Sequence, residues 1–328
     1  MDTFKSFKDA LYSVNESNFE DIALHLFRFQ ALKNPVYQHY LKHLNTHIDS
    51  IQTISQIPFL PINFFKSQAV RTGDWAPQAE FTSSGTTGSI TSRHLVYDLD
   101  FYRELSTRIF EYTYGPLSNY HIVALLPSYL ERSGSSLIAM LDHFIKQSDS
   151  EYSGFYLYNH KELIENLGTI KHDKRQVILW GVTFALLDLA EAHPVDLGNA
   201  IIMETGGMKG RRKELIREEV HGCLTDRFRV PAIHSEYGMT ELMSQAYSQG
   251  GGYYACPPWM KIFTRDLNDP FQWVSGRAGI INVIDLANFH SCAFIETQDL
   301  GRLSQPGYFE VLGRMDNSDV RGCNLLVG

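Results

Sequence analysis

The sequence predicts an α/β fold, in which a mostly parallel β-sheet has helices on both faces and a small antiparallel or barrel segment follows. Two observations carry this prediction. Between about residues 120 and 240, short apolar runs alternate with polar loops and helical runs, and repeated strand–helix units form right-handed crossovers onto a parallel sheet. After about residue 250 the apolar runs are separated by Gly, Pro and Asp, which is typical of antiparallel strands.

The first segment, residues 1–70, is expected to be helical. Apolar residues recur at spacings of three and four from Phe19 to Phe27 and again from Tyr37 to Ile48, and Pro35 separates the two runs. The two prolines of IPFLPINFF end the helical segment, because proline lacks an amide donor and restricts the residue before it.

The central segment, residues 71–250, supplies the strands of the parallel sheet. Its strand-like runs are VALLP, VILW, AIIME and AIH, the last of which leads into SEYGMTELMSQAYS. Ligands of parallel sheets bind at the carboxyl ends of the strands, and those ends carry Ser, Gly, Thr and Glu here. With the β-rich segment 251–328, the whole chain is expected to form one large domain with its site at these strand ends.

Composition and charge exclude several classes of function. The 29 basic and 37 acidic residues give a net charge of -8, so nucleic acid is not an expected partner. The most apolar stretch, from Val177 to Ala190, is shorter than the ~18 to 20 residues of a membrane span and contains Asp188. The N-terminus lacks the uncharged apolar core of a signal peptide, and the 4 cysteines form no CxxC pair, so we expect a cytoplasmic protein with reduced thiols.

The strongest local motif is the loop FTSSGTTGS at residues 81–89. Seven of its nine residues are Ser, Thr or Gly, so its backbone amides and hydroxyls can surround the oxygens of a phosphate. The lysine of a Walker A loop is absent, and Arg93 is a candidate for the missing positive charge. The alternative is a flexible surface loop of the same composition.

Two further motifs suit a nucleotide. In SEYGMTE, residues 235–241, an aromatic ring at a strand end can stack on a base, a hydroxyl can reach phosphate and a carboxylate can hold Mg²⁺. The alternative for this segment is an ordinary helix start. In the tail, TQDLGR at residues 297–302 precedes GRMD at 313–316, and an Asp with a nearby Arg can bind ribose hydroxyls and phosphate.

The order of these motifs resembles that of the adenylate-forming enzymes, the superfamily of acyl-CoA synthetases, adenylation domains and luciferases. Within it, the chain is similar to the LuxE-like acyl-protein synthetases from about residue 57 to the end, on PFLPINFFKS, TSSGTTG, PSYLERSGSSL, GGMKG, SEYGMTE and GRMDNSDVRGC. The resemblance implies the fold of the superfamily's large domain, with ATP and Mg²⁺ as cofactors. It also implies that a carboxylic acid, a fatty acid in that family, becomes an acyl-adenylate and is then passed to a thiol of a protein acceptor such as an acyl reductase or carrier.

The resemblance assigns a role to each motif residue. The leaving phosphates would be held by Ser83, Ser84, Gly85, Thr86, Thr87 and Gly88. The adenine would be framed by Gly206, Gly207, Tyr237 and Gly238. Thr240 would contact the α-phosphate and Glu241 would hold Mg²⁺. The ribose would be bound by Asp299, with Arg314 beside it.

The sequence departs from the superfamily pattern in two places. Gln298 replaces the glycine that usually precedes the ribose aspartate. The chain also ends soon after GRMD, so the mobile C-terminal domain with its catalytic lysine is expected to be absent. Arg93, Lys209 or a partner protein would then do the work of that lysine.

Cys323 is the candidate acyl acceptor, because LuxE-like enzymes pass the acyl group through a cysteine near the C-terminus. Arg321 nearby would favour the thiolate that this chemistry needs. The alternative is a small buried residue that closes the last strand.

Two other functions stay open: a non-catalytic nucleotide-binding or acyl-binding subunit of a reductase or carrier complex, and an acyl-CoA ligase.

Three histidines, His39, His43 and His47, would share one face of a helix at a spacing of four residues. Adjacent turns separate them by about 6 Å each, and a tetrahedral zinc site usually gathers ligands from more than one element. We therefore expect a solvated helix face here.

Overall fold

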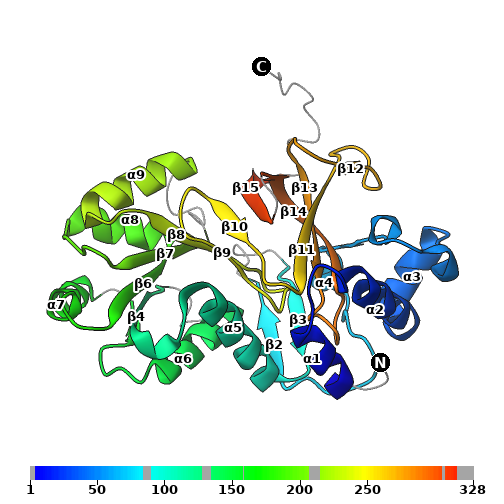
Figure 1. Cartoon of the computed structure of the whole chain (residues 1–328), viewed down its shortest axis with the longest axis horizontal. Coiled ribbons are helices and arrows are strands. Elements are labelled where there is room, and N and C mark those ends of the chain that lie inside the picture. The colour runs from blue at the N-terminus through cyan, green and yellow to red at the C-terminus, as the bar shows by residue number, and fades with distance from the viewer. Residues whose placement is uncertain are drawn as a thin grey trace. The chain divides into compact units, whose positions relative to one another are not determined.

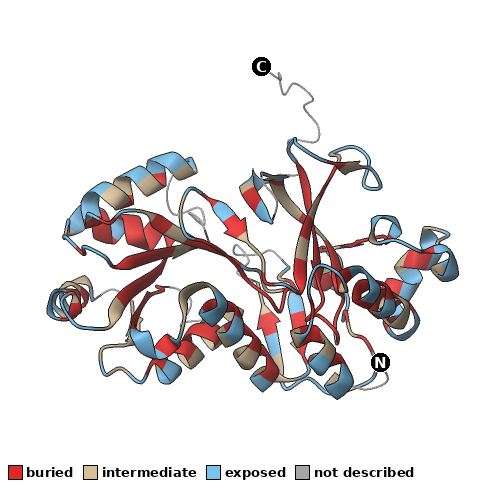
Figure 2. Ribbon diagram, in the orientation of Figure 1, coloured by how far each residue is buried: buried red, intermediate tan, exposed pale blue. Residues whose placement is uncertain are grey.

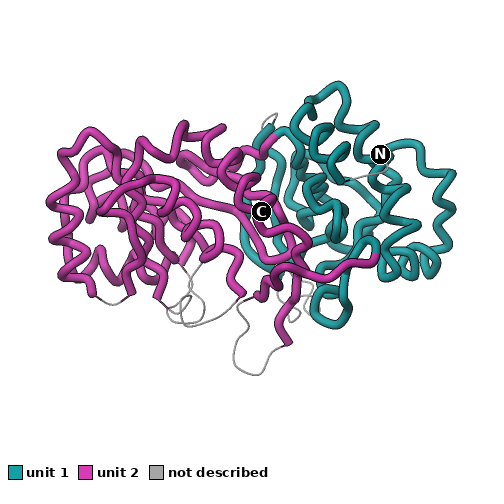
Figure 3. The backbone as a smooth tube through the Cα atoms, turned by 90° about the horizontal axis from the view of Figure 1, so that it is seen from below, with its two compact units in different colours: residues 1–73, 258–328 teal, residues 74–257 magenta. Residues whose placement is uncertain are grey.

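The computed structural model describes residues 4–83, 90–127, 134–157, 159–206, 215–304 and 307–315. It has two compact units, residues 1–73 with 258–328 and residues 74–257 (Figure 3). The first and last segments of the chain thus share one unit. That the whole chain forms a single domain stays a prediction.

The unit of residues 74–257 is built on a mostly parallel sheet. Its parallel strands lie in the order β8-β7-β6-β4-β5. They are β4 (Tyr120–Leu125), β5 (Gly154–Tyr156), β6 (Gln176–Val182), β7 (Ile201–Thr205) and β8 (Ile233–Tyr237). Two antiparallel strands, β9 (Ala246–Ser248) and β10 (Tyr253–Ala255), extend the sheet beyond β8. A separate antiparallel pair consists of β2 (Ala79–Thr82) and β3 (Arg93–Val96).

Helices cover both faces of this sheet. Figure 1 shows α8 (Thr183–Ala192) and α9 (Arg217–Phe228) on one face, and α5 (Leu99–Tyr114) and α6 (Ser136–Ser148) on the other. The remaining helices of the unit are α7 (His160–Ile170) and the short η3 (Leu117–Asn119). All six residues of β4 are buried, as expected for a strand that is covered on both sides (Figure 2). The predicted fold is therefore confirmed in this unit.

Side-chain caps and aromatic packing explain why these elements form where they do. Asp98 accepts the amide hydrogen of Phe101 at the start of α5, and Ser135 accepts that of Ile138 at the start of α6. Between the sheet and these helices, the rings of Phe110, Phe144, Trp180 and Tyr247 pack against one another.

One alternative from the sequence is wrong. The segment after His234 is not a helix start, because β8 continues through Tyr237 and the chain returns antiparallel as β9. The reason is that polar and aromatic side chains alternate along this stretch. The side chains of Ser235 and Tyr237 lie on one face of the strand and that of Glu236 lies on the other. Such alternation suits a strand whose two faces are both packed.

The unit of residues 1–73 and 258–328 combines N-terminal helices with an antiparallel sheet. The helices are α1 (Phe4–Tyr12), α2 (Phe19–Lys33), α3 (Pro35–His43) and α4 (Phe64–Ser67), with short turns η1 (Ile48–Ser50) and η2 (Ile54–Gln56). The antiparallel strands lie in the order β12 (Trp273–Val274), β11 (Met260–Arg265), β13 (Gly279–Asp285), β14 (Phe294–Leu303) and β15 (Tyr308–Arg314). Strand β1 (Leu60–Pro61) pairs parallel to β14.

A buried glutamine explains why two distant segments share this unit. Gln30 on α2 donates to the carbonyl oxygens of Asn288, Phe289 and Ser291, and it accepts the amide hydrogen of Ala293. Its side chain thus satisfies the backbone of the turn before β14, which would otherwise leave polar groups buried without partners.

The expectation of three histidines on one helix face is wrong. Helix α3 ends at His43, and Asn45 takes a left-handed conformation with φ of 53°, so His47 lies beyond the helix. Within the described ranges, no group of three His, Cys, Asp or Glu residues is arranged to hold a metal ion. Among the described helices, none has both the length and the apolar character that a membrane span requires.

Candidate active site

The SEYGMTE motif lies at the carboxyl end of β8, where ligands of parallel sheets bind. Tyr237 ends the strand, and its ring meets the edge of Tyr254 with 6.0 Å between centroids. Thr240 and Glu241 follow in the loop, and Glu241 is only 5% exposed. The structure therefore places the three side chains assigned to base, phosphate and metal within five residues at one strand end.

A buried histidine holds this loop to the strand that follows the phosphate-loop motif. His94 on β3 donates from Nδ1 to the carbonyl oxygen of Thr240 over 2.8 Å. Burial lowers the pKa of His94 to about 4, so the ring is neutral at pH 7 and acts as a donor without adding charge. The hydrogen bond brings two motifs that are far apart in the sequence to the same place.

The flanks of the phosphate-loop motif are described, while its centre is not. The backbone amide of Ser83 donates to Ser92, and the Ser83 hydroxyl accepts the Ser92 amide hydrogen, so the two ends of the loop are joined. Arg93 is exposed and lies opposite Thr82 in the β2–β3 pair. The other five predicted phosphate ligands lie outside the described residues: Ser84, Gly85, Thr86, Thr87 and Gly88.

The end of β7 carries Gly206, with φ of 78°, close to a half-buried carboxylate, that of Glu204. Glu204 accepts hydrogen bonds from the hydroxyls of Thr183 at 2.6 Å and Ser235 at 3.0 Å. His221 lies 3.6 Å from the same carboxylate. Burial by itself raises the pKa of Glu204, but the hydrogen bonds outweigh it and hold the pKa below its usual value. Gly207 and Lys209 lie outside the described residues.

A second carboxylate, Glu236, lies at the end of β8 on the opposite side of the strand from Tyr237. Its Oε2 accepts a hydrogen bond from the hydroxyl of Thr205 at 2.6 Å. Burial raises the pKa of Glu236 to about 7, and the charge of Glu204 adds to the rise. The sequence analysis missed both glutamates. The available signal was an acidic residue at the next-to-last position of two short strand-like runs.

The ribose motif lies in the other unit, on β14 and β15. Thr297 donates to the carbonyl oxygen of Ile281 at 2.8 Å and accepts the amide hydrogen of Asp299 at 3.0 Å, which fixes the backbone at the aspartate. Asp299 pairs directly with Arg314 on the neighbouring strand. The structure thus brings these two predicted residues together. The tail that contains Cys323 lies outside the described residues.

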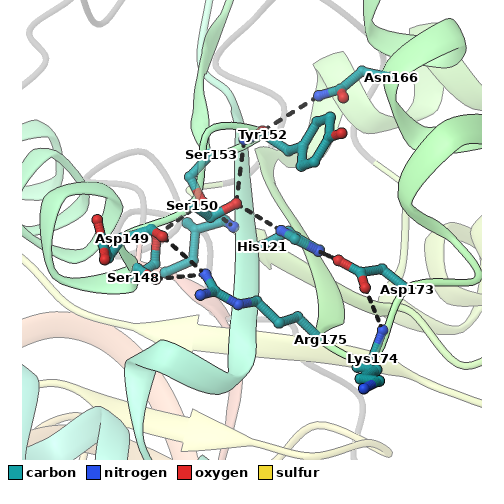
Figure 4. Close-up of polar contacts among 11 residues, drawn as sticks. His121, Ser148, Asp149, Ser150, Tyr152, Ser153, Asn166, Asp173, Lys174 and Arg175 are labelled. Atoms are coloured by element: carbon teal, nitrogen blue, oxygen red, sulfur yellow. Dashed lines mark hydrogen bonds and ion pairs between the residues drawn. The ribbon is translucent and has the colours of Figure 1, made fainter.

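Figure 4 shows another polar cluster, at the amino end of β4. The hydroxyl of Ser150 lies 2.6 Å from Nδ1 of His121, and Nε2 of His121 lies 2.8 Å from Asp173. The residue types are those of a hydrolase triad, but His121 is buried and the Ser150 hydroxyl also accepts the amide hydrogen of Tyr152. The cluster ties two loops to the start of β4, which is a structural task.

The known proteins that are similar to this chain include ligases. No protein-family model matches this chain. The chain is 24% identical to the long-chain-fatty-acid–luciferin-component ligase of Aliivibrio fischeri over 330 residues, which cover 91% of this chain and 85% of that protein.

Solved structures agree on the fold. 2-Hydroxyisobutyryl-CoA ligase with a bound adenylate is similar with a TM-score of 0.67 and 12% identity, covering 92% of this chain and 69% of that one. ATP-bound MatB from Rhodopseudomonas palustris is similar with a TM-score of 0.52 and 14% identity, over 74% of this chain and 49% of that one. The predicted α/β architecture is confirmed, and these structures share it over most of this chain.

Proposed function

We propose, from the confirmed resemblance to LuxE-like fatty acid ligases, that this chain activates a carboxylic acid with ATP and passes the acyl group to a protein thiol. The observation that carries the proposal is the position of Tyr237, Thr240 and Glu241 at the carboxyl end of β8 in a chain similar to a fatty acid ligase over 91% of its length. A fatty acid is the proposed substrate class.

The first step joins the acid to AMP. The substrate carboxylate is already ionised at pH 7, so it attacks the α-phosphorus without a general base, and pyrophosphate leaves. Amides and hydroxyls of the 83–88 loop bind the leaving phosphates, and the Thr240 hydroxyl donates to an α-phosphate oxygen. These groups oppose the negative charge that develops on the phosphate oxygens.

Glu241 is the residue that would hold Mg²⁺, because a carboxylate oxygen at a strand end is a ligand that this cation prefers. The ion would supply charge neutralisation on the phosphates. Glu241 is nearly buried, so its position in the loop is fixed before the nucleotide arrives.

In the second step a thiolate attacks the acyl carbon of the adenylate and AMP leaves. Cys323 is the proposed acceptor on this chain, before transfer to a partner protein. Cys223 and Cys292 are free thiols, and the proposed chemistry needs a reducing compartment such as the cytoplasm.

A second candidate is an acyl-CoA ligase, which the similarity to 2-hydroxyisobutyryl-CoA ligase favours. The two functions differ in the thiol that receives the acyl group. A non-catalytic binding subunit is the third candidate, and it predicts no turnover of ATP.

Transfer of a radiolabelled fatty acid tests these candidates together. With ATP and Mg²⁺, the proposed function predicts label on the wild-type protein that hydroxylamine removes, and no label on Cys323→Ser. An acyl-CoA ligase predicts labelled acyl-CoA from both proteins when free coenzyme A is added. No labelled product under any condition would favour the binding subunit.

A further inference from the structure

We propose that Tyr254 is a positioning residue for the nucleotide, and that it holds the ring of Tyr237 in the orientation that the adenine needs. A carboxylate, that of Glu204, in turn holds Tyr254 through Ser235. The inference deepens the proposed function and rests on it, since it takes Tyr237 to frame the base of ATP. All four residues belong to the unit of residues 74–257.

Three neighbouring strands bring these side chains to one face of the sheet. Ser235 on β8 pairs with Ser248 on β9. Ala255 on β10 pairs with Tyr247 on β9. The antiparallel register therefore puts the preceding residue, Tyr254, beside Ser248. Paired residues of a ladder have their side chains on the same face, and the small Ser248 leaves room for the ring of Tyr254 to reach Ser235.

A chain of two hydrogen bonds anchors the hydroxyl of Tyr254. Ser235 donates its only hydroxyl hydrogen to Oε1 of Glu204 at 3.0 Å. Tyr254 is hydrogen-bonded to the same serine side chain, so the tyrosine hydroxyl is the donor in that bond. Burial raises the pKa of Tyr254 well above its usual value, so the hydroxyl keeps its hydrogen at pH 7.

The charge of Glu204 gives this chain its direction. Its other oxygen accepts the Thr183 hydroxyl hydrogen at 2.6 Å, and His221 lies 3.6 Å from Oε1. Burial raises the pKa of Glu204, but the hydrogen bonds outweigh it and keep the pKa below its usual value, so the group is ionised and can only accept. Ser235 must therefore donate to Glu204, and only its lone pairs remain for Tyr254.

The ring of Tyr254 transmits this restraint to Tyr237. The two rings meet edge to face, with 6.0 Å between their centroids and 62° between their planes. Tyr254 is 6% exposed and Tyr237 is 8% exposed, so neither ring can turn without displacing its neighbours. The turn before β10 is packed as closely, because the guanidinium of Arg217 lies where a Cβ of residue 252 would be, and residue 252 is Gly252 with φ of 74°.

A ring that is already oriented favours binding of the base, because less side-chain freedom is lost when the nucleotide arrives. In this arrangement Tyr254 acts through Tyr237 and needs no contact with ATP. Loss of its hydroxyl is therefore expected to weaken the contribution of the base and to leave the contribution of the phosphates unchanged.

The test measures how much the base adds to nucleotide affinity. Isothermal titration calorimetry with Mg²⁺ and without acid gives Kd for ATP and for ribose 5-triphosphate, which lacks the base. The Kd for ribose 5-triphosphate divided by that for ATP is the base contribution. Tyr254→Phe is expected to lower this ratio about 3- to 10-fold, the effect of one hydrogen bond. Glu204→Gln is expected to act in the same direction, because its amide can donate and Ser235 no longer has to.

A double-mutant cycle separates positioning from a general loss of structure. Tyr237→Ala removes the ring and is expected to lower the ratio about 10-fold or more. In that background there is no ring to orient, so Tyr254→Phe and Glu204→Gln are expected to change the ratio by less than about 2-fold. A merely structural role would weaken binding of ATP and ribose 5-triphosphate alike, or would add to the loss in Tyr237→Ala.

Two features of the variants guard the comparison. Tyr253→Phe makes the same change at the neighbouring tyrosine of β10, which is 42% exposed, and it is expected to match wild type. Tyr254→Phe keeps the buried ring and loses one hydroxyl, so it remains informative if Glu204→Gln does not fold.

The outcomes separate this inference from the proposed function. A ratio that Tyr254→Phe leaves unchanged, or losses that add in the double variants, would overturn the role of Tyr254. The expected changes in the ratio, without acid-dependent exchange of pyrophosphate by wild type, would support that role and reject adenylation. Exchange by wild type together with an unchanged ratio in Tyr254→Phe would do the reverse, and failure of wild type to bind ATP would reject both.

Discussion

The two edges of the parallel sheet differ in how their polar side chains are satisfied. At the amino edge, both ring nitrogens of His121 have partners, Ser150 and Asp173, and the Tyr114 hydroxyl lies 3.0 Å from Nδ1 of His234. At the carboxyl edge, the side-chain oxygen of Gln245 and the hydroxyl of Tyr247 are buried and have no hydrogen-bond partner among the described residues. Saturated clusters stabilise the fold, whereas open buried atoms indicate a place for a ligand.

The amino edge also contains a cavity of about 270 Å³, lined in part by Tyr114, Tyr120 and His234. The hydroxyls of both tyrosines are already used, by His234 and by the Tyr114 carbonyl oxygen. A cavity is therefore not by itself evidence of a ligand site. The two edges of the sheet are compared by which of their buried polar atoms lack hydrogen-bond partners.

The largest expected effect is at the metal position of the carboxyl edge. Glu241→Gln removes the charge that would hold Mg²⁺, so we expect acid-dependent AMP formation to fall by about 10²- to 10³-fold, as when one preorganised electrostatic contact is lost. The melting temperature should change little, because the amide is nearly isosteric. Unchanged AMP formation in the variant would show that Glu241 has no role in the reaction.

The next effect is on stability, through Glu236. Its pKa in the folded chain is raised to about 7, so between about pH 4.5 and 7 the folded state binds more protons than the unfolded state. The free energy of unfolding therefore falls as pH rises through this window, by at most about 3 kcal/mol. Urea denaturation at a series of pH values measures this, and Glu236→Gln should flatten that part of the profile. A profile that Glu236→Gln leaves unchanged would contradict the shift.

A smaller effect is expected where the two motifs of the carboxyl edge are joined. His94→Phe fills the space of the imidazole but cannot donate to the Thr240 carbonyl oxygen, so the loop is held less firmly. We expect kcat for adenylate formation to fall about 10-fold, because a rise of about 1.4 kcal/mol in the activation free energy corresponds to that factor. The affinity for ATP should change less. An unchanged kcat would show that the hydrogen bond does not position Thr240.

The smallest effect is expected at the amino edge. Ser150→Ala removes one partner of His121, and a lost hydrogen bond at such a site costs about 1 kcal/mol of stability. Adenylate formation measured below the melting temperature should equal that of wild type. A loss of activity in the folded variant would show that the amino edge is not purely structural.

The sequence predicts the elements better than the contacts between them. The spacing of apolar residues places α2 and α3 near their observed positions, and Pro35 separates them as the first residue of α3. The motif SEYGMTE is predicted at a strand end and lies there. These features are local, so the order of residue types is sufficient to find them.

Features that depend on pairing between distant strands are not visible in the sequence. The pair Thr205–Glu236 exists because β7 and β8 align in parallel, with Glu204 opposite Ser235. Likewise, the sequence shows Gln30 only as one polar residue of a helix. Its contact with the turn before β14 becomes visible only in the folded structure. Burial of a polar residue is the informative signal, and it appears only once the fold is known.

Acid-dependent exchange of labelled pyrophosphate into ATP tests the central claim most directly. The wild-type protein is assayed with Mg²⁺ across acetate, fatty acids, their hydroxy and amino derivatives, and aryl acids, with Glu241→Gln alongside. Our account predicts exchange with one class of acid and its loss in the variant. No exchange with any acid, by a folded protein that binds ATP, would contradict the claim that the carboxyl edge of this sheet performs adenylation.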